Sequence, residues 1–299
     1  MKAAAKILVT GGCGYVGSEL VKELTNRGIE YLSVDNRVAV VEKGQVRADL
    51  RERARVLELI NTFKPEMLVH CATHSALAYR DHFVNAFRDD ALVISNILES
   101  LTGLAACRLV AFSSSYCYSG LSTQLPASED MPLQASHNFG VAKLFFEQLM
   151  ARVHISTVVF RLSSVFGPGT ALHPNAILGM AKECFESGKL TVWGSGTRKM
   201  QYIHVGDAVR YILGASAVDP GVYNLGGNEY TSVAETAKAI ADFFGVEMEF
   251  LRDKREGETL PFMSTGKLKR AFGDDITPFA RSLGSYLEFL NATRSAHKD

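Results

Sequence analysis

Short apolar runs alternate with longer amphipathic segments through the first half of the chain. Runs of strand length stand at residues 6–10, 31–35, 67–71, 108–113 and 156–162, and they predict buried β-strands. Between them, apolar residues recur at helical spacing near residues 15–27, 51–63, 85–103 and 139–153. Strands joined by helices of this length favour right-handed crossovers and a parallel sheet. We therefore predict an α/β fold, in which a doubly wound parallel sheet binds its ligands at the carboxyl ends of the strands.

The pattern becomes irregular after residue 163, where glycines and prolines stand close together (Gly167, Pro168, Gly169 and Pro174). Beyond them, the pattern predicts helices near 174–188 and 232–245 and short strands near 190–193 and 222–225. We expect residues 1–163 to form the main domain. Residues 164–299 are expected to form mainly a smaller C-terminal α/β cap that binds substrate, with some segments returning to the main sheet.

The composition is that of a soluble globular protein, with 47% hydrophobic and 21% charged residues. The 32 basic and 32 acidic side chains cancel, so the chain has no electrostatic footprint for nucleic acid or for a membrane surface. An anionic substrate would therefore have to be held by a few local cations.

The cysteines indicate a reducing compartment. Five are present, an odd number without zinc-like spacing: Cys13, Cys71, Cys107, Cys117 and Cys184. No signal peptide is recognisable, and no apolar run approaches the roughly 18 residues that a membrane span needs. We expect a cytoplasmic protein with free thiols. Since no two histidines stand at ligand spacing on a helix, no metal site is predicted.

A glycine-rich loop closes the first predicted strand and opens the first predicted helix. Gly11, Gly14 and Gly17 stand three residues apart around Tyr15 and Val16. Glycines here permit a tight turn and close approach of the backbone to a pyrophosphate, which the helix N-terminus then binds. In this setting, between a strand and a helix, the loop predicts a Rossmann-type dinucleotide site.

An acidic residue ends the second predicted strand. Asp35 can accept hydrogen bonds from the adenosine ribose hydroxyls, which favours NAD over NADP. Asn36 and Arg37 follow it, and the arginine keeps NADP open as an alternative. Further along, Asp49 and Leu50 are candidate adenine contacts, although an ordinary acidic loop residue would explain Asp49 almost as well.

Along nearly its whole length the sequence resembles the nucleotide-sugar epimerases and dehydratases, which are extended short-chain dehydrogenases/reductases. The motifs that carry the resemblance are Thr10 to Gly17, Asp35, His70-Cys71-Ala72-Thr73, Phe112-Ser113-Ser114-Ser115, Gly140 to Lys143, Arg161 to Gly169, Tyr202 to Asp207, Tyr223 to Gly227, and Arg255-Glu256-Gly257-Glu258. The resemblance implies an NAD-dependent enzyme and places Cys71, Ala72, Thr73 and Lys143 at the cofactor.

Enzymes of this family use a serine or threonine, a tyrosine and a lysine as their catalytic set. The resemblance assigns the serine role to Ser114 and the lysine role to Lys143. The tyrosine position, four residues before the lysine, holds Phe139. A phenylalanine keeps the ring but has no ionisable oxygen, so it cannot transfer the proton that the tyrosine transfers.

Three hypotheses account for Phe139. The first is an engineered Tyr→Phe change. The second is a chain that uses another acid or base, for which the candidates are Tyr116, Tyr118, Cys117 and His74. The third is a protein that binds NAD and sugar but catalyses no reaction. Tyr116 is the sharpest of these candidates, although an aromatic pocket wall explains Tyr116 and Tyr118 as well. The family's 4,6-dehydratases carry an acidic pair where this chain has Ser115 and Tyr116, which disfavours dehydration.

The resemblance also implies how a nucleotide sugar is held. In the family an arginine precedes the strand at Tyr202, but this chain has Met200 there, with Arg198 and Lys199 just upstream. Arg255 matches a second phosphate-binding arginine. Ser164 replaces an asparagine near the sugar, and Ser115 is a further candidate contact. Solvated surface charge is the alternative for the three cations.

These features together predict an epimerase of a nucleotide-activated sugar that works through a transient keto intermediate. A dehydratase or ketosugar reductase of the same fold, or a protein that only binds NAD and sugar, are the alternatives. The family resemblance further implies a homodimer that pairs the helices near 85–103 and 139–153.

Overall fold

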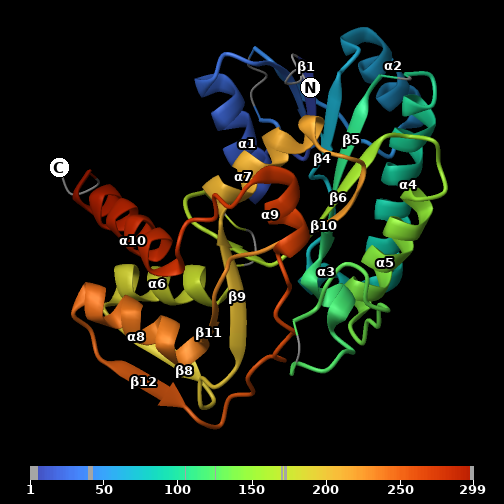
Figure 1. Ribbon diagram of the computed structural model, residues 1–299. Helices are drawn as coiled ribbons and strands as arrows, with labels where there is room; N and C mark the ends of the chain where they lie inside the picture. Colours follow the sequence, from blue (N-terminus) through green and yellow to red (C-terminus); the bar gives the residue numbers. More distant parts are fainter. Residues whose placement is uncertain are drawn as a thin grey trace.

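A computed structural model describes residues 6–39, 43–104, 106–124, 126–169, 171 and 174–296. Its centre is a seven-stranded sheet in the order β10-β6-β5-β4-β1-β2-β3 (Figure 1). The strands are β1 (Lys6–Thr10), β2 (Glu30–Asp35), β3 (Gln45–Arg47), β4 (Met67–His70), β5 (Arg108–Ser114), β6 (Thr157–Leu162) and β10 (Gly221–Leu225). Every neighbouring pair is parallel. The strand order reverses between β1 and β4, which is where ligands bind in such sheets.

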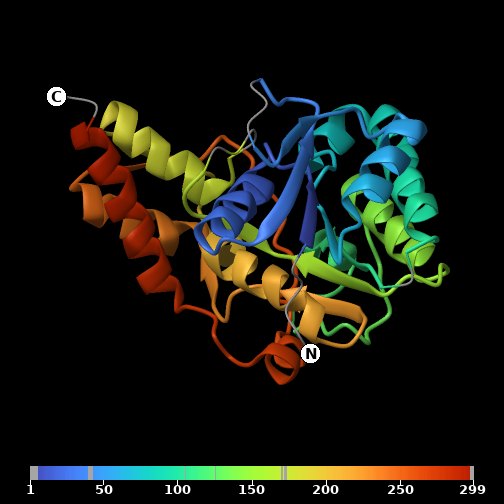
Figure 2. The ribbon, with the colours of Figure 1, turned by 90° about the horizontal axis from the view of Figure 1, so that it is seen from above.

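Helices cover both faces of this sheet (Figures 1 and 2). One face carries α1 (Tyr15–Asn26) and α7 (Val205–Gly214), and the other carries α2 (Arg53–Phe63), α4 (Phe83–Leu101) and α5 (Asn138–Met150). Their apolar faces are buried against the strands, as with Leu20 and Leu24 of α1, which are fully buried. Burying side chains of this size contributes about 1.5–3 kcal/mol each, which fixes the helices on the sheet.

A second layer of elements stands beside the main sheet. It contains a three-stranded sheet of β7 (Ser164–Phe166), β9 (Lys199–His204) and β11 (Tyr230–Ser232), and a pair of β8 (Leu190–Trp193) and β12 (Met248–Leu251). The helices α6 (Ala176–Ser187), α8 (Val233–Phe244) and α10 (Phe279–Ala296) pack on them. A separate apolar core fills this part, with Phe166 and Leu283 among its buried members.

The predicted fold class is confirmed, and every strand and helix named from the pattern is present with shifts of a few residues at the ends. The strand near 222–225 belongs to the main sheet as β10, where it pairs with β6. Several elements escaped the pattern, namely β3, β7, β9, β11, β12, α3 (Ala76–Asp81), α7, α9 (Gly266–Phe272) and α10. Most of these strands are short, with only three or four residues, so alternation has little length in which to show itself.

No helix in the described part of the chain has the length and apolar character to cross a membrane. The five cysteines are all free.

Candidate functional site

The glycine loop lies at the switch point between β1 and β4. Gly11 has a φ of +73°, and a Cβ on it would come within 2.6 Å of the Ala72 amide nitrogen. A Cβ on Gly17 would come within 2.2 Å of the Gly11 carbonyl oxygen. Both positions therefore require glycine, because the loop, the first turn of α1 and the end of β4 are in direct backbone contact.

The N-terminus of α1 is open for an anion. Its N-cap residue is Gly14, and no side chain caps the helix. The first-turn amides, from Tyr15 to Gly17, are the donors that such a terminus offers to a phosphate. Tyr15 holds the loop in place through its hydroxyl, which donates to the Gly167 carbonyl oxygen at 2.8 Å. The helix end is thus free of a side-chain cap where the sequence predicts a pyrophosphate.

Asp35 stands beside this loop at the end of β2. Its buried carboxylate accepts the Cys13 amide at 3.0 Å and the Arg37 amide at 2.9 Å. The Arg37 guanidinium also donates to it, at 3.2 and 3.3 Å. Asn36 is exposed. A carboxylate at the end of the second strand fits the ribose hydroxyls of NAD, and the loop and Arg37 hold it in position.

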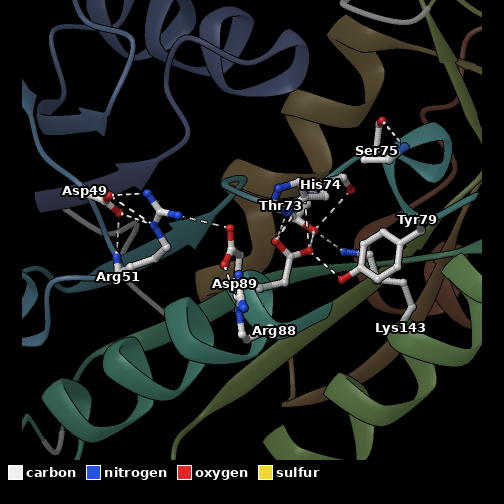
Figure 3. A network of polar contacts seen from close by, with 11 residues as sticks. Asp49, Arg51, Thr73, His74, Ser75, Tyr79, Arg88, Asp89 and Lys143 are labelled. Atoms are coloured by element: carbon white, nitrogen blue, oxygen red, sulfur yellow. Dashed lines mark hydrogen bonds and ion pairs between the residues drawn. The ribbon is translucent and has the colours of Figure 1, made fainter. Parts of the chain in front are cut away.

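The candidate adenine contacts are engaged within the chain. The Asp49 carboxylate forms an ion pair with Arg51 at 2.7 Å, and Arg51 reaches on to Asp89 (Figure 3). Leu50 is buried, and its carbonyl accepts from Asn96. These contacts join the segment before α2 to α4, and the adenine role of Asp49 and Leu50 stays a prediction.

Lys143 and Phe139 lie one helical turn apart on α5. The Lys143 side chain is buried, and its Nζ donates to Thr73 Oγ1 at 2.9 Å. The same Nζ lies 5.2 Å from the centre of the Phe139 ring. Burial lowers the pKa of Lys143, and Asp90 opposes that shift. The Lys143 cation therefore stands beside the Phe139 ring, next to the end of β4.

Ser114 and Tyr116 meet the start of α5. Ser114 is the last residue of β5, and its Oγ accepts the Tyr116 amide at 3.3 Å. A Cβ on Gly140 would come within 2.3 Å of the Tyr116 carbonyl oxygen. The Tyr116 and Phe139 rings are 6.0 Å apart, edge to face. Ser115 begins the turn η1 (Ser115–Tyr118) beside them. The serine, Tyr116 and Phe139 predicted to share a site are thus held together by the close approach of α5.

Two of the alternative acid/base candidates are enclosed in the protein. Tyr118 is fully buried; its hydroxyl accepts from Arg161 at 2.6 Å and lies 2.8 Å from Asn224 Oδ1. Cys117 is also fully buried, and burial raises the pKa of its thiol to about 11. Neither side chain is open to solvent, so the structure does not support Tyr118 or Cys117 as a replacement for the missing phenol.

Two further residues of this region escaped the sequence analysis. Asp90 is a buried carboxylate on α4, and Tyr79 is a fully buried phenol on α3 whose hydroxyl donates to Asp90 at 2.8 Å. A signal for Asp90 was present, because it stands on the apolar stripe of α4 with Ala86, Val93 and Ile97. A charged residue on a buried stripe needs partners.

The substrate-binding candidates of the cap gather where two loops meet. Glu256 accepts the amides of Ser195, Gly196 and Arg198 at 2.6–2.9 Å. The Arg198 Nε donates to the Glu258 carbonyl oxygen at 2.8 Å. The hydrogen bonds of Glu256 hold its pKa at about 2, so it keeps its charge. Residues 195–198 and 256–258 thus form one unit that the sequence treated as two motifs.

The other cap candidates lie around this unit. Lys199 Nζ lies 5.7 Å above the ring of Tyr230, and Arg255 is exposed. Met200, at the position of the usual arginine, packs against the apolar core of the cap. Ser164 Oγ accepts from Asn175 Nδ2 at 2.9 Å, and Asn175 caps α6. Among the described residues, no group of three His, Cys, Asp or Glu side chains is placed to hold a metal ion.

Comparison with known proteins agrees with this arrangement. The model of the NAD dependent epimerase/dehydratase family matches residues 7–226. The UDP-glucose 4-epimerase of Bacillus subtilis (strain 168) is 28% identical over 314 residues, which cover 89% of this chain and 91% of that protein. A dTDP-4-dehydro-6-deoxy-D-allose reductase of a Streptomyces species is 27% identical over 270 residues, which cover 81% of this chain and 82% of the reductase.

Solved structures share the fold. The UDP-glucose 4-epimerase of Thermus thermophilus, solved with NAD, superposes with a TM-score of 0.85 at 22% identity, and the match covers 96% of this chain and 99% of that one. MoeE5 with UDP-glucuronic acid and NAD gives a TM-score of 0.84 at 24% identity, with the same coverage. Since the family model spans most of the chain, including the glycine loop and Lys143, the chain belongs to the NAD dependent epimerase/dehydratase family.

Proposed function

We propose that this chain epimerises a carbon of a nucleotide-activated sugar through a transient ketone. The observation that carries the proposal is the position of Lys143 Nζ between the Phe139 ring and Thr73, just beyond the carboxyl end of β4. This proximity supports the carboxyl end of the sheet as the reaction site. The UDP-glucose 4-epimerases among the relatives support the reaction class.

The glycine loop and Asp35 would hold NAD, which supplies reversible hydride transfer when bound. Lys143 would hold the nicotinamide ribose and would place a positive charge near the reacting hydroxyl. That charge stabilises negative charge on oxygen, most strongly where the surroundings are apolar. Ser114, at the end of β5, donates a hydrogen bond to the same sugar oxygen. These two groups position the hydroxyl and polarise it.

The cap would bind the remainder of the substrate. Arg198, Lys199 and Arg255 are the cations for a diphosphate, and an arginine guanidinium matches phosphate geometry. Arg198 already uses its Nε on Glu258, which leaves its terminal nitrogens for a phosphate. Ser164, held by Asn175, would contact the sugar. The smaller Ser164, compared with the family's asparagine, favours a sugar with an altered hydroxyl pattern.

We also propose that the protein forms a homodimer through α4 and α5. Val84, Leu92, Val141 and Phe145 lie on these two helices with 44–73% of their surface exposed. The helices contact each other, and Phe87 stacks between them on Phe146. An apolar surface shared by two adjacent helices fits pairing with the same surface of a second copy.

The test compares the chain as it stands with the Phe139→Tyr variant. Each is incubated with NAD and a panel of UDP- and dTDP-linked sugars, starting with UDP-glucose, and the products are separated by chromatography and identified by NMR. Conversion to an epimer with no net change in NAD supports the proposal. Stoichiometric conversion of NAD to NADH, with oxidation of the sugar, would instead identify a ketosugar reductase running in reverse. Binding without conversion by either form would identify a protein that only binds NAD and sugar.

A further inference from the structure

A buried carboxylate on α4 collects four hydrogen bonds near the end of β4. Asp90 accepts from the Thr73 hydroxyl at 2.7 Å, the His74 amide at 3.1 Å, the His74 Nδ1 at 2.7 Å and the Tyr79 hydroxyl at 2.8 Å. Figure 3 shows Thr73, His74, Tyr79 and Lys143 gathered at this point. Through Thr73 the cluster is joined to Lys143. Hydrogen bonds from this many donors fix the position of the buried Asp90 carboxylate and of the groups bonded to it.

The charge on Asp90 decides which nitrogen of His74 carries the proton. Burial alone would raise the pKa of Asp90, but His74, Lys143 and Thr73 together hold that pKa below its usual value. An ionised carboxylate only accepts hydrogen bonds, so Nδ1 of His74 must be the donor. In the neutral imidazole the lone pair then lies on Nε2, the nitrogen that points away from Asp90.

His74 is also the accessible member of the group. Its side chain is 40% exposed, whereas that of Asp90 is 7% exposed. Tyr79 is fully buried, and its ring packs 5.4 Å from that of Phe139. Burial and Asp90 raise the pKa of Tyr79, so this phenol keeps its proton. Of the described groups bonded to Asp90, His74 therefore combines exposure with a fixed tautomer.

We propose that His74, oriented by Asp90, is the acid–base residue for the sugar hydroxyl, in place of the phenol that Phe139 lacks. The inference rests on the proposed function. When the sugar is oxidised, the hydroxyl O–H bond breaks and its proton moves to Nε2 of His74. The electron pair of that bond becomes part of the new C=O bond, and the hydride that leaves the carbon passes to NAD. In the reverse half the imidazolium returns the proton to the oxygen.

The charges around His74 set the direction of the pH dependence. Asp90 chiefly, with Asp89, raises the pKa of His74, while partial burial and Arg51 oppose the shift. Lys143, from α5, acts on Asp90. Because a base must be neutral, kcat/KM should fall as the pH drops through the raised pKa of His74. Without the phenol, no other basic group in the cluster should replace it.

The experiment measures turnover of the sugar converted in the function assay, from pH 5 to 9, by the full chain and four variants. These are His74→Gln, Asp90→Asn, Phe139→Tyr and the double variant Phe139→Tyr with His74→Gln. His82→Gln is the matched control, because His82 is exposed and lies at the junction of α3 and α4. NAD binding and circular dichroism are recorded for each protein, and NMR follows the titration of the His74 Cε1 proton with and without Asp90.

We expect His74→Gln to lose about 10²–10⁴-fold in kcat/KM, as for the removal of a general base. His74→Gln should bind NAD as the unchanged chain does. His82→Gln should match the unchanged chain in kcat/KM. The double variant should regain turnover, because tyrosine then supplies the missing oxygen. Asp90→Asn should lower the pKa of His74 measured by NMR, and it should move the acidic limb of the kcat/KM profile to lower pH. A merely structural role of Asp90 would not produce these shifts.

Other results overturn the inference in distinguishable ways. If His74→Gln turns over like the unchanged chain, or if only Phe139→Tyr proteins are active, His74 is not the base while the proposed function stands. If Asp90→Asn leaves the His74 pKa unchanged, the orienting role of Asp90 is wrong. If no form converts any sugar, the proposed function itself fails, and this inference with it.

Discussion

Glu147 of α5 and Arg161 of β6 form an ion pair inside the protein. Arg161 Nη2 and Nε lie 2.6 and 2.9 Å from the two carboxylate oxygens, and both side chains are almost fully buried. The remaining guanidinium nitrogen donates to Tyr118. The pair fastens the helix that carries Phe139 and Lys143 to the strand beside Ser114. It therefore ties α5 to the part of the sheet in which Ser114 lies.

Glu147→Gln should destabilise the fold strongly. The substitution leaves the Arg161 charge buried without its counter-ion, and breaking such a pair costs about 3–5 kcal/mol. Urea unfolding followed by circular dichroism measures the loss. Lys238→Ala is the matched control, since Lys238 and Asp242 form an ion pair of similar length on the exposed face of α8, and exposed pairs contribute at most about 1 kcal/mol. Equal losses in the two variants would contradict this account.

Gly11→Ala should impair NAD binding and stability together. Its Cβ would meet the backbone of Cys71 and Ala72 at less than 3 Å, and its φ is +73°, a conformation that costs a non-glycine residue about 1–3 kcal/mol. Isothermal titration with NAD should show a Kd weaker by roughly tenfold or more, the equivalent of about 1.4 kcal/mol. In Gly179→Ala, within α6, the Cβ meets nothing within 4 Å, so stability should rise by about 0.5–1 kcal/mol. Unaltered NAD affinity in Gly11→Ala would refute the role of the loop.

His70 should make the fold sensitive to mild acid. Burial first, and Lys143 next, lower the pKa of His70 to about 4, from 6.5 in a model compound. The unfolded chain therefore binds a proton between these two values while the folded chain does not, so folding stability falls as the pH drops from 6.5 to about 4. Above the upper value both states are neutral and the contribution vanishes. The urea concentration at the unfolding midpoint is measured from neutral pH down to about pH 4.5, and it should fall less steeply in His70→Asn than in the unchanged chain. Equal slopes against pH in the two proteins would contradict this role of His70.

Phe145→Glu should convert a dimer into a monomer. A carboxylate at the centre of the exposed surface on α4 and α5 would be buried without a partner in the complex. Sedimentation velocity at micromolar concentration measures the oligomeric state of each protein. Trp193→Glu is the control, because Trp193 is a similarly exposed apolar side chain on β8, away from these helices. A monomeric unchanged chain would exclude the proposed dimer.

Local patterns were sufficient for most strands of the main sheet. The strands β1, β2, β4, β5 and β6 were predicted because each is a short, mainly apolar run, as strands buried on both faces are expected to be. The glycine loop was recognisable because tight turns restrict residue type locally. The role expected for Lys143 came from the family motif, and its position beside residue 139 needs only one helical turn.

Only the tertiary structure shows which groups lie near Phe139. Asp90 and Lys143 are far apart in the sequence, and only the packing of α4 and α5 on one face of the sheet brings both to Thr73. The same holds for Arg198 and Glu258, which meet because two loops of the cap close on each other. The sequence by itself determined the fold class, the dinucleotide loop and the absence of a phenol at position 139. Only the tertiary structure decided that Asp90 orients His74 and that Tyr79 and Tyr118 are buried. The burial and charge of a side chain are set by neighbours from distant segments, which no local pattern specifies.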